Sequence, residues 1–403
     1  MTTPQRVFLH DDATARGFEP FALTRPIATL TTGMLPISAR WEAIGAESAG
    51  LLAADHLADF DEGQAPTPAT LPAGSIVANS RFAPALSQTL SPDESVWTAD
   101  GRVVAVRLAR SMGRDHFGST LDLGTLAARS AARREVSGWW HDEVWDFLRH
   151  LPAILAADIS HFVTGKKSRR DPALPELSTI LGTNAVIAAG AVIEPHVVFD
   201  ASAGPIFIDE GAHVHAFTRI NGPCYVGRNA TIMGGDITGC SIGPVSKIRG
   251  EISGTIVLGY SNKGHDGFVG NSYLGQWVNL GAGTVTSNLK NTYGEVALWT
   301  PTGIRPTGMQ FLGTLFGDHV KTGIGTKLTT GTVLGAGANV FGSRMPPKAV
   351  APFSWGECEP YDLYQIDKFL STAATVMSRR KVELSERAKR QLAASFAKRW
   401  SVK

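Results

Sequence analysis

Two short patterns in the sequence place side chains together that could do chemistry. Asp11 and Asp12 are adjacent near the start of the chain, and such carboxylates either bind Mg²⁺ or cap a helix. His213 and His215 flank Val214. Because Val214 is expected to point inward, both imidazoles are expected to point outward, as zinc ligands would. A third histidine at suitable reach is not evident, so we predict no metal ligands.

The composition limits the kinds of protein that could position these residues. Of 403 residues, 43% are hydrophobic and 18% are charged, which is typical of a folded globular protein. The net charge of +2 creates no field that gathers nucleic acid or membrane, so neither is expected as a partner. The three cysteines show no CxxC spacing, and no signal peptide or spanning apolar run is evident. We therefore expect a cytoplasmic protein without a disulfide framework.

From residue 181 onward, aliphatic residues recur every six positions, and small or acidic residues usually follow them. Members of this series include Leu181, Ile187, Ile193, Ile208, Val214, Ile220, Val226, Ile232, Ile242, Ile248, Leu258, Leu274, Leu280, Leu334 and Val340. A period of six fits neither a helix nor an alternating strand. It predicts a left-handed parallel β-helix of hexapeptide repeats, in which three hexads close one coil and the aliphatic side chains point inward. Residues 259–268 and 290–311 interrupt the period and are predicted to be loops that leave the coil wall.

Shifts in composition divide the chain into four parts. Residues 1–163 mix short apolar runs with helical patterns, which predicts an α/β domain. Residues 164–177 are basic and contain prolines, which predicts a linker whose KKSRR cluster is a solvated hinge and not a nucleic-acid patch. The β-helix should then occupy residues 178–356. Residues 357–403 are helical in pattern and basic, and we expect them to form an amphipathic cap over the open end of the β-helix.

One segment closely resembles a known enzyme family. Residues 261–288, SNKGHDGFVGNSYLGQWVNLGAGTVTSN, contain K-G-H-x-x-x-x-G and V-N-x-G-A-G-T, and an asparagine follows four positions later. This pattern resembles the acetyltransferase domain of the bifunctional N-acetylglucosamine-1-phosphate uridyltransferase/glucosamine-1-phosphate acetyltransferases. The resemblance is specific over about 30 residues and general over 181–342.

A second resemblance, to the shorter GlmU-like sugar nucleotidyltransferases, covers nearly the whole chain. Its marks are FALTRP (21–26), RWE (40–42), VWDF (144–147), GYSNKGHDGF (259–268), LGQWVNLGAGT (274–284), SNLKN (287–291), GMQFLG (308–313), GDHVKTGI (317–324) and PFSWG (352–356). The resemblance implies a reduced nucleotidyltransferase-like α/β domain followed by an acyltransferase-like β-helix.

The resemblance also implies roles for individual residues. His265 matches the family's catalytic general base, and an imidazole that titrates near neutral pH can take the proton of an amine that attacks acetyl-CoA. Asn279 matches an asparagine beside that amine, and Asn288 matches one that holds the sugar, although asparagines also form structural ladders in β-helices. Ala282 matches a position whose backbone amide lies near the thioester, where it would stabilise the oxyanion.

The chain departs from the acetyltransferase family where phosphate is bound. Three residues stand in place of the family's Lys and Tyr: Ser253, Phe268 and Leu289. Arg249 and Lys263 are expected to supply the missing cationic donors, so the acceptor need not be glucosamine-1-phosphate. Lys321 and Gly323 are expected on the next coil, where the family binds CoA.

The first domain retains fewer family features. Sugar nucleotidyltransferases cradle a triphosphate in a Gly-rich loop after the first strand, but here that place reads FLHDDATARGFEPFALTRP, without G-x-G. Arg16 and Arg25 are predicted to bind substrate, as an echo of the family's T-R-x-x-P-L-T. If the domain is active, Asp11 and Asp12 are candidates to hold Mg²⁺ with a nucleoside triphosphate. A degenerate binding or scaffolding domain is the alternative.

Together these expectations describe a homotrimer in sugar-nucleotide biosynthesis of the UDP-GlcNAc type. It would transfer an acetyl group from acetyl-CoA to an amino-sugar phosphate or a nucleotide-linked amino sugar. The main alternative is a sugar-1-phosphate nucleotidyltransferase whose β-helix only trimerises and regulates. A non-enzymatic trimeric scaffold and a zinc enzyme of carbonic anhydrase type, built on His213 and His215, are the others.

Overall fold

The computed structural model describes residues 5–62, 66–127, 132–165 and 174–402, and the chain divides into two compact units. The N-terminal unit comprises Met1–Phe18, Ala22–Phe147 and Ser385–Ser395. The β-helix unit comprises Glu19–Phe21, Leu148–Leu384 and Phe396–Lys403. The KKSRR cluster of the expected linker, residues 166–170, lies outside the described residues.

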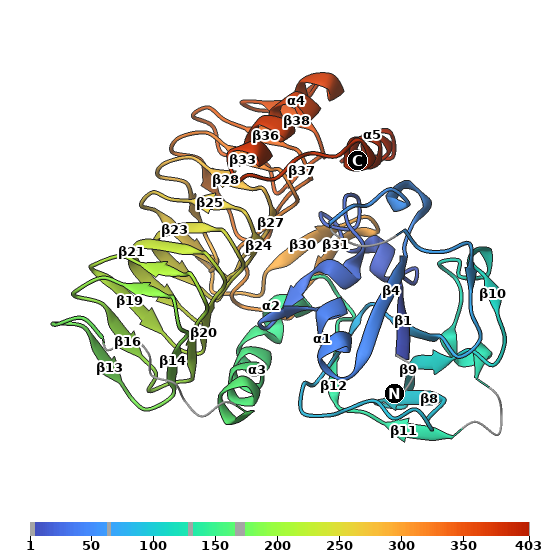
Figure 1. Cartoon of the computed structure of the whole chain (residues 1–403). Helices are drawn as coiled ribbons and strands as arrows, with labels where there is room; N and C mark the ends of the chain where they lie inside the picture. Colours follow the sequence, from blue (N-terminus) through green and yellow to red (C-terminus); the bar gives the residue numbers. More distant parts are fainter. Residues whose placement is uncertain (1–4, 63–65, 128–131, 166–173, 403) are drawn as a thin grey trace. The chain divides into compact units, whose positions relative to one another are not determined.

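The N-terminal unit is built on a mixed six-stranded sheet (Figure 1). Its order is β11 (Arg133–Glu135), β8 (Val96–Ala99), β9 (Arg102–Arg107), β6 (Ile76–Asn79), β1 (Gln5–His10), β4 (Ala46–Leu52). The apolar run of β1 is buried because this strand lies inside the sheet and pairs in parallel with both β4 and β6. The α/β domain expected from the mixed sequence texture is confirmed.

Shorter elements surround this sheet. Helix α1 (Ile37–Ala43) begins directly after Pro36, which presets the helical entry, and it buries Trp41. The remaining pairs are β2 (Thr31–Thr32) with β3 (Leu35–Pro36), β5 (Thr70–Leu71) with β10 (Met112–Gly113), and β7 (Phe82–Pro84) with β12 (Gly138–Trp140). Helix α2 (Asp146–Arg149) follows at the end of the unit.

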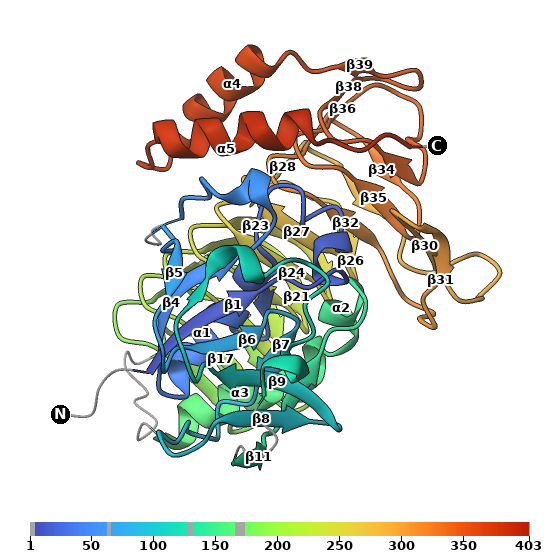
Figure 2. The same ribbon diagram turned by 90° about the vertical axis from the view of Figure 1, so that its right-hand side faces the viewer.

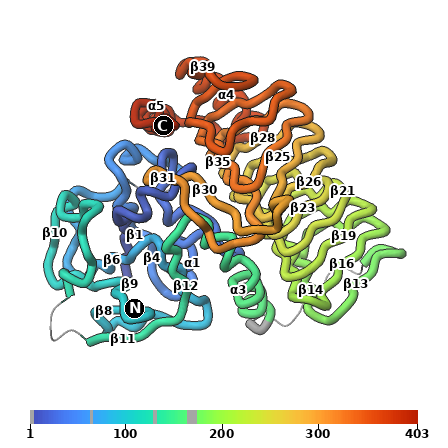
Figure 3. Tube along the Cα trace, turned by 180° about the vertical axis from the view of Figure 1, so that it is seen from behind, coloured from blue at the N-terminus to red at the C-terminus, as the bar shows by residue number. Residues whose placement is uncertain are grey.

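The predicted hexapeptide β-helix is confirmed as a stack of coils whose strands pair in parallel (Figure 3). Within the described residues, one wall is a nine-stranded sheet. Its strands are β14 (Ala185–Ile187), β17 (Ile206–Ile208), β20 (Cys224–Val226), β22 (Ser241–Ile242), β24 (Ile256–Gly259), β27 (Tyr273–Gln276), β32 (Thr314–Phe316), β35 (Thr332–Leu334) and β37 (Ala349–Val350).

A second, larger sheet forms the other faces of the coils. Its strands are β13 (Thr179–Leu181), β15 (Val192–Ile193), β16 (Val198–Asp200), β18 (His213–Val214), β19 (Thr218–Asn221), β21 (Thr231–Thr238), β23 (Lys247–Ser253), β25 (Asn262–Lys263), β26 (Phe268–Gly270), β28 (Asn279–Leu280), β33 (Lys321–Thr322), β36 (Asn339–Val340), β38 (Ser354–Gly356) and β39 (Asp362–Leu363). Strands β29 (Val285–Thr286) and β34 (Lys327–Leu328) form a further parallel pair.

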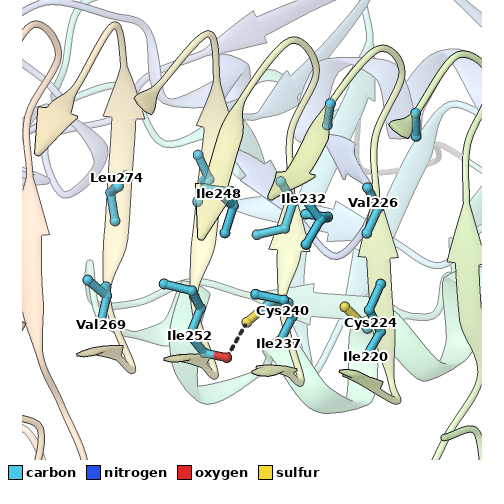
Figure 4. Packing of buried hydrophobic residues seen from close by; sticks show 14 of the residues in the cluster. Ile220, Cys224, Val226, Ile232, Ile237, Cys240, Ile248, Ile252, Val269 and Leu274 are labelled. Carbon is cyan, nitrogen blue, oxygen red and sulfur yellow. Dashed lines mark hydrogen bonds between the residues drawn. The ribbon is translucent and has the colours of Figure 1, made fainter. Parts of the chain in front are cut away.

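The aliphatic members of the hexads point into the coil and stack on one another. Figure 4 shows Ile232 and Ile248 on neighbouring strands, with Ile237 and Ile252 below them. All four are buried, as are the thiols of Cys224 and Cys240. The core is therefore a column of small and branched side chains, which accounts for the period of six in the sequence.

The first predicted interruption of the coil, residues 259–268, differs from expectation. Strand β25 lies within it and continues the coil, because Asn262 pairs with Lys247 and Lys263 pairs with Ile248. Lys263 therefore takes the inward position that an aliphatic residue holds elsewhere, and only 1% of its surface is exposed. A charged residue at an inward position broke the hydrophobic pattern and concealed a regular coil.

The second predicted interruption, residues 290–311, does leave the coil. It contains an antiparallel hairpin of β30 (Ala297–Thr300) and β31 (Gly303–Pro306), which Figure 2 shows extending away from the wall of parallel strands. The predicted loop is therefore an ordered hairpin.

Helix α3 (Leu151–Gly165) belongs to the β-helix unit, where Phe162 contacts Phe207 of β17. The N-terminal compact unit consequently ends at Phe147, before the expected boundary at residue 163.

The two C-terminal helices differ in the compact unit to which most of their residues belong. Helix α4 (Ile366–Ser378) lies over the last coils, where Phe369 packs edge-on against Phe353 and His319 (Figure 1). Residues 386–395 of α5 (Glu386–Ala397) belong instead to the N-terminal unit. Phe396, near the end of α5, contacts Phe353 with centroids 5.1 Å apart, so α4 and the last residues of α5 both pack on the β-helix unit. None of the helices in the described parts of the chain is long and apolar enough to cross a membrane.

Candidate functional site

Three consecutive coils bring most of the predicted acyltransfer residues to one face of the β-helix. The Cα atoms of Asn262, Asn279 and Lys321 are register partners on β25, β28 and β33. Each of these residues precedes an inward-pointing one, so their own side chains face outward. The Nδ2 of Asn262 donates to Oδ1 of Asn279 at 3.0 Å, which orients the amide of Asn279. Asn279 is exposed.

The loop that carries His265 packs on the turn that carries Ala282. The amide of Gly283 donates to the carbonyl of Asp266 at 3.2 Å, so the residues that follow Ala282 and His265 are in contact. Gly267 approaches this turn so closely that a Cβ would lie 2.4 Å from the carbonyl oxygen of Thr284, and its φ is +134°. Only glycine fits there without a shift of the backbone. His265 itself is exposed, as a base that meets a substrate must be.

Lys263 fixes the His265 loop from inside the coil. Its ammonium donates to the carbonyls of Arg249, at 3.0 Å, and of His265. Burial lowers the pKa of Lys263 to about 8; the charge of Asp266 opposes this shift and that of Arg249 adds to it. Lys263 was predicted to donate hydrogen bonds to a phosphate. In the structure its ammonium is directed at backbone carbonyls instead.

Arg249 is the predicted cation that remains at the surface of this face. Its Nε lies 3.0 Å from Oδ1 of Asp266, and its Nη1 donates to the carbonyl of Met233 at 2.7 Å. Nearly half of the side chain is exposed. Arg249 thus holds the His265 loop from outside while it keeps part of its guanidinium accessible.

The residues predicted to contact CoA follow on the next coil. Lys321 is half-buried, its ammonium donates to the carbonyl of His319 at 3.2 Å, and burial lowers its pKa to about 8. The amide of Gly323 donates to the carbonyl of Val340 at 2.8 Å. The backbones of Gly281 and Gly323 are in close contact, since a Cβ on Gly281 would lie 2.5 Å from Gly323. The turn with Ala282 therefore lies directly beside the turn with Gly323.

Asn288 lies on a neighbouring wall of the coil. Its Nδ2 donates to Oδ1 of Asn271 at 2.8 Å, in the kind of ladder that a structural asparagine forms. Phe268 of β26 pairs with Glu251 of β23, and Leu289 forms an isolated bridge with Phe311. The wall that the resemblance predicts to bind phosphate therefore presents an aromatic ring and a carboxylate.

A stack of rings borders this site at one corner of the coils. Tyr260 stacks on Trp277 with centroids 4.5 Å apart, and Trp277 stacks on His319 at 6.4 Å. All three residues have positive φ, between 54° and 62°, a backbone conformation that is uncommon outside glycine. His319 is buried under Phe369 of α4, so it belongs to this stack and does not face outward with Lys321.

In the N-terminal unit, the acidic pair lies at the carboxyl ends of β1 and β6, where open α/β sheets bind ligands. Asp12 is held there by Arg81, which follows β6: the Arg81 guanidinium lies 2.8 Å from Oδ2 of Asp12 and 2.7 Å from Oδ1 of Asp142. Burial raises the pKa of Asp12, but the hydrogen bonds and charge of Arg81 outweigh it and the net pKa is lowered. Burial raises the pKa of Asp11 to about 6.

Arg81 and Asp142 are not among the residues predicted from the sequence. Arg81 could have been predicted from the order of the strands. It follows β6, which is parallel to β1, so it lies at the same edge of the sheet as the residues that follow β1. Asp12 also accepts from the amide of Ala15 at 2.9 Å, so the alternative role of capping a helical turn is observed.

The two predicted arginines of this unit do not lie in equivalent surroundings. Arg16 donates from Nε to the carbonyl of Asp11 at 3.0 Å, which places it at the same sheet edge. Arg25 is buried and forms a two-pronged pair with Glu62 at 2.7 and 3.1 Å. Arg25 is thereby an internal ion-pair partner, whereas Arg16 is near the candidate ligand position.

Comparisons with known proteins give a family match in the N-terminal part of the chain and partial matches to curated proteins. The family described as sugar nucleotidyl transferase matches residues 7–167. A bifunctional sugar-1-phosphate nucleotidylyltransferase/acetyltransferase of Sulfurisphaera tokodaii is 32% identical over 91 residues, which cover 23% of each chain. The bifunctional protein GlmU of Methanococcus vannielii is 27% identical over 205 residues, which cover 50% of this chain and 43% of that protein.

The matched segments cover less than half of each of these relatives. Among solved structures, an Arabidopsis UDP-N-acetylglucosamine acyltransferase aligns over 52% of this chain and 80% of its own, with 14% identity and a TM-score of 0.27, a similarity too low to bear on function. The chain is thus similar to the sugar nucleotidyl transferase family over residues 7–167 and to divergent GlmU-type bifunctional transferases over part of its length.

Proposed function

We propose that the face formed by β25, β28 and β33 transfers an acetyl group from acetyl-CoA to the amine of an amino-sugar phosphate or a nucleotide-linked amino sugar. The observation that carries this proposal is the hydrogen bond from Gly283 to Asp266, because it joins the loop of a candidate base, His265, to the turn of a candidate oxyanion donor, Ala282. Acyl transfer needs these two groups on either side of one reacting carbonyl.

In the proposed reaction, a ring nitrogen of His265 takes a proton from the attacking amine while the new C–N bond forms at the thioester carbonyl. The amide of Ala282 stabilises the negative charge that develops on the carbonyl oxygen. When the C–S bond breaks, the sulfur of CoA takes the proton from the imidazolium, so protons and charges balance. Asn279 orients the amine, and Lys321 with the turn at Gly323 contacts CoA.

The acceptor is expected to differ from that of the bifunctional relatives. Arg249 supplies a partly exposed guanidinium near the loop, but Glu251 and Phe268 occupy the neighbouring wall. Glu251 would repel a negatively charged group of the acceptor that lay on that wall. We therefore expect a single phosphate or diphosphate to lie near Arg249 and a less polar part of the acceptor to lie near Phe268.

The test is the acetyl-CoA-dependent release of free thiol over a panel of amino-sugar phosphates and nucleotide-linked amino sugars. Wild type should turn over at least one acceptor, and His265→Ala should lose at least 100-fold in kcat. His196→Ala, which removes another histidine of the β-helix unit, is the matched control and should keep wild-type activity. Equal activity in wild type and His265→Ala would overturn the role of His265, and no turnover with any acceptor would overturn the proposed reaction.

The family match to residues 7–167 supports a second candidate function, sugar-1-phosphate nucleotidyl transfer by the N-terminal unit. Asp11, Asp12 and Arg16 would hold Mg²⁺ and the nucleoside triphosphate, but Arg81 would first have to release Asp12. Pyrophosphate release from UTP or dTTP in the presence of sugar-1-phosphates, lost in Arg16→Ala, would support this function. Absence of pyrophosphate release with every sugar tested would leave the unit with a binding or scaffolding role.

We also propose that the protein works as a homotrimer in the cytoplasm. The support is the hexapeptide β-helix together with the free thiols of Cys224, Cys240 and Cys358, which suit a reducing compartment. Light scattering coupled to gel filtration should give three times the mass of the 403-residue chain.

A further inference from the structure

One cluster of histidines and a carboxylate lies outside the proposed acyltransfer face. It consists of Glu194, His213 and His215, on two consecutive coils. Val192 pairs with His213 and Ile193 with Val214, so Glu194, which follows β15, stacks on His215, which follows β18. The Oε1 of Glu194 lies 2.9 Å from Nε2 of His213 and 3.3 Å from Nδ1 of His215. All three ligand atoms lie within 4.8 Å of one another.

These distances are close to those of three ligands around one metal ion. Four ligands at 2.0–2.1 Å from a tetrahedral zinc ion are separated from each other by about 3.3 Å. The separation of the Glu194 and His215 ligand atoms matches that value, and the other two separations need changes of only about 0.5–1.5 Å to reach it. Two imidazole nitrogens and one carboxylate oxygen suit Zn²⁺ and its neighbours and leave a fourth position for water or another ligand.

The fold holds the three side chains in place before any ion arrives. The second oxygen of Glu194 accepts the amide of Ala216 at 2.9 Å, which fixes the carboxylate and turns its other oxygen toward the imidazoles. The two rings stack with centroids 4.3 Å apart. The amides of Glu194 and His215 donate to carbonyls of the following coils at 2.9 and 2.8 Å, so the backbone cannot move independently. Such fixed partners of the ligands raise metal affinity.

The cluster is accessible, because 34% of the Glu194 side chain and 37% of each histidine are exposed. Both imidazoles can bind while neutral, since each needs only to keep its proton on the ring nitrogen that faces away from Glu194. The sole negative charge of the set, on Glu194, would leave a bound divalent ion with a net charge of +1. That charge favours an anionic or water-derived fourth ligand.

We propose that Glu194, His213 and His215 form a binding site for one divalent transition-metal ion of the zinc class. The ion would join two consecutive coils of the β-helix from outside. The site is separate from the proposed acyltransfer face: His213 pairs with Thr231, Thr231 with Lys247 and Lys247 with Asn262, which places it three coils before the His265 loop. The proposal does not depend on the proposed acetyl transfer.

The test uses the full-length, tag-free protein after treatment with a chelator. Zn²⁺ is titrated by calorimetry, and Co²⁺ by visible absorption, whose intense d–d bands report a low coordination number. We expect one ion per chain, together with a rise in the melting temperature on metal addition. His213→Ala and Glu194→Gln should each weaken Zn²⁺ binding by at least 100-fold and abolish the Co²⁺ bands.

His196→Ala is the matched control, because His196 lies two residues from Glu194 but stacks on Phe217, with centroids 5.4 Å apart. It should bind Zn²⁺ as wild type does. If His213→Ala misfolds by circular dichroism, Glu194→Gln still decides the matter, because it keeps the shape and the oxygen that accepts Ala216. No binding by wild type, or undiminished binding by a folded Glu194→Gln protein, would overturn the proposal.

Discussion

Lys263 occupies an inward position of its coil and donates a hydrogen bond to the backbone carbonyl of His265, two residues further along. The same ammonium donates to the carbonyl of Arg249 on the preceding coil. Arg249 in turn pairs through its side chain with Asp266. The loop of the candidate base is consequently held from inside by one cation and from outside by another, and this arrangement yields the first two predictions.

Replacing Lys263 with methionine should separate the role of this residue in positioning from its role in folding. Methionine fills the inward position with an apolar chain of similar length, so we expect the melting temperature to stay within a few degrees of wild type or to rise. Without its inner anchor the His265 loop should become mobile, and kcat for acetyl transfer should fall about 10-fold with little change in KM. Lys247→Met, on the outward position of the preceding coil, is the control and should keep kcat.

The lowered pKa of Lys263 predicts a pH dependence of stability. Its ordinary pKa is 10.5 and its folded value is about 8, so between these values the unfolded chain binds more protons than the folded one. The free energy of unfolding should therefore rise as the pH increases from 8 toward 10.5. Denaturant unfolding of wild type and Lys263→Met across this range measures the effect. The variant should show a smaller slope but not a flat one, because burial lowers the pKa of Lys321 to about 8 as well. Identical slopes would contradict the assignment.

Asn279 and Asn339 offer a matched pair for the candidate site, because both lie on the outward ladder that also contains Lys321. Asn279→Ala should lower kcat/KM for acetyl transfer about 10-fold or more, since the amide that Asn262 orients is removed. Asn339→Ala should have no effect, because Asn339 lies three coils beyond the coil from which the His265 loop projects. Equal losses in both variants would show that the ladder acts only through stability.

Arg81 is expected to stabilise the N-terminal unit. Arg81→Ala leaves Asp12 partly buried without its guanidinium, which should cost about 2–3 kcal/mol of unfolding free energy. Arg102→Ala removes an exposed partner of Asp142 and a guanidinium that lies 3.9 Å from the centre of the Trp140 ring, and it should cost about 1 kcal/mol. Because the pKa of Asp12 is lowered in the folded state, the difference in unfolding free energy between the variants should be present at pH 7. It should be lost as the pH falls below the ordinary Asp pKa of 3.8 and through the lowered pKa of the folded state. Urea unfolding at pH 7 and at a pH below 3.8 measures this difference.

Helix α5 is expected to stabilise the N-terminal unit through a buried amide. Gln391 donates to the carbonyl of Thr24 at 3.1 Å and to the hydroxyl of Ser395 at 2.9 Å, and it is almost fully buried. Gln391→Ala should cost about 1–2 kcal/mol of unfolding free energy. Arg390→Ala, which removes the neighbouring ion pair with the exposed Asp59, should leave the unfolding midpoint unchanged. A shift of the midpoint in Arg390→Ala alone would reverse this assignment.

The sequence pattern was sufficient to predict the β-helix, because inward aliphatic residues such as Ile232 and Ile248 repeat in most of the coils. The same rule failed at Lys263, since a hydrophobic periodicity cannot register a charged residue whose stem fills the core and whose ammonium bonds to carbonyls. The partner of α5 was also beyond the pattern, because an amphipathic period shows that a helix has an apolar face but not what covers it.

The candidate sites also contain some residues that the sequence could group and others that it could not. Residues near one another in sequence, such as His265 and Ala282, could be grouped from their motifs. Glu194 lies 19 residues before His213, and its contact follows from the coil register and not from a local motif. That register could have been extended from the alignment of Ile193 with Val214, one coil apart, and it would have placed Glu194 beside His215. Arg81 and Asp142 are 61 residues apart and required the sheet order.

The inward lysine has a further consequence for the β-helix as a polymer of coils. Each coil contacts chiefly the coils before and after it. The stability of the unit is therefore approximately the sum of a term for each coil and a term for each interface between neighbouring coils. At Lys263 the aliphatic column is interrupted by an ammonium, which weakens one link between two stronger blocks. Thermal opening should therefore begin at an internal joint as well as at the ends, and that joint is the coil from which His265 projects.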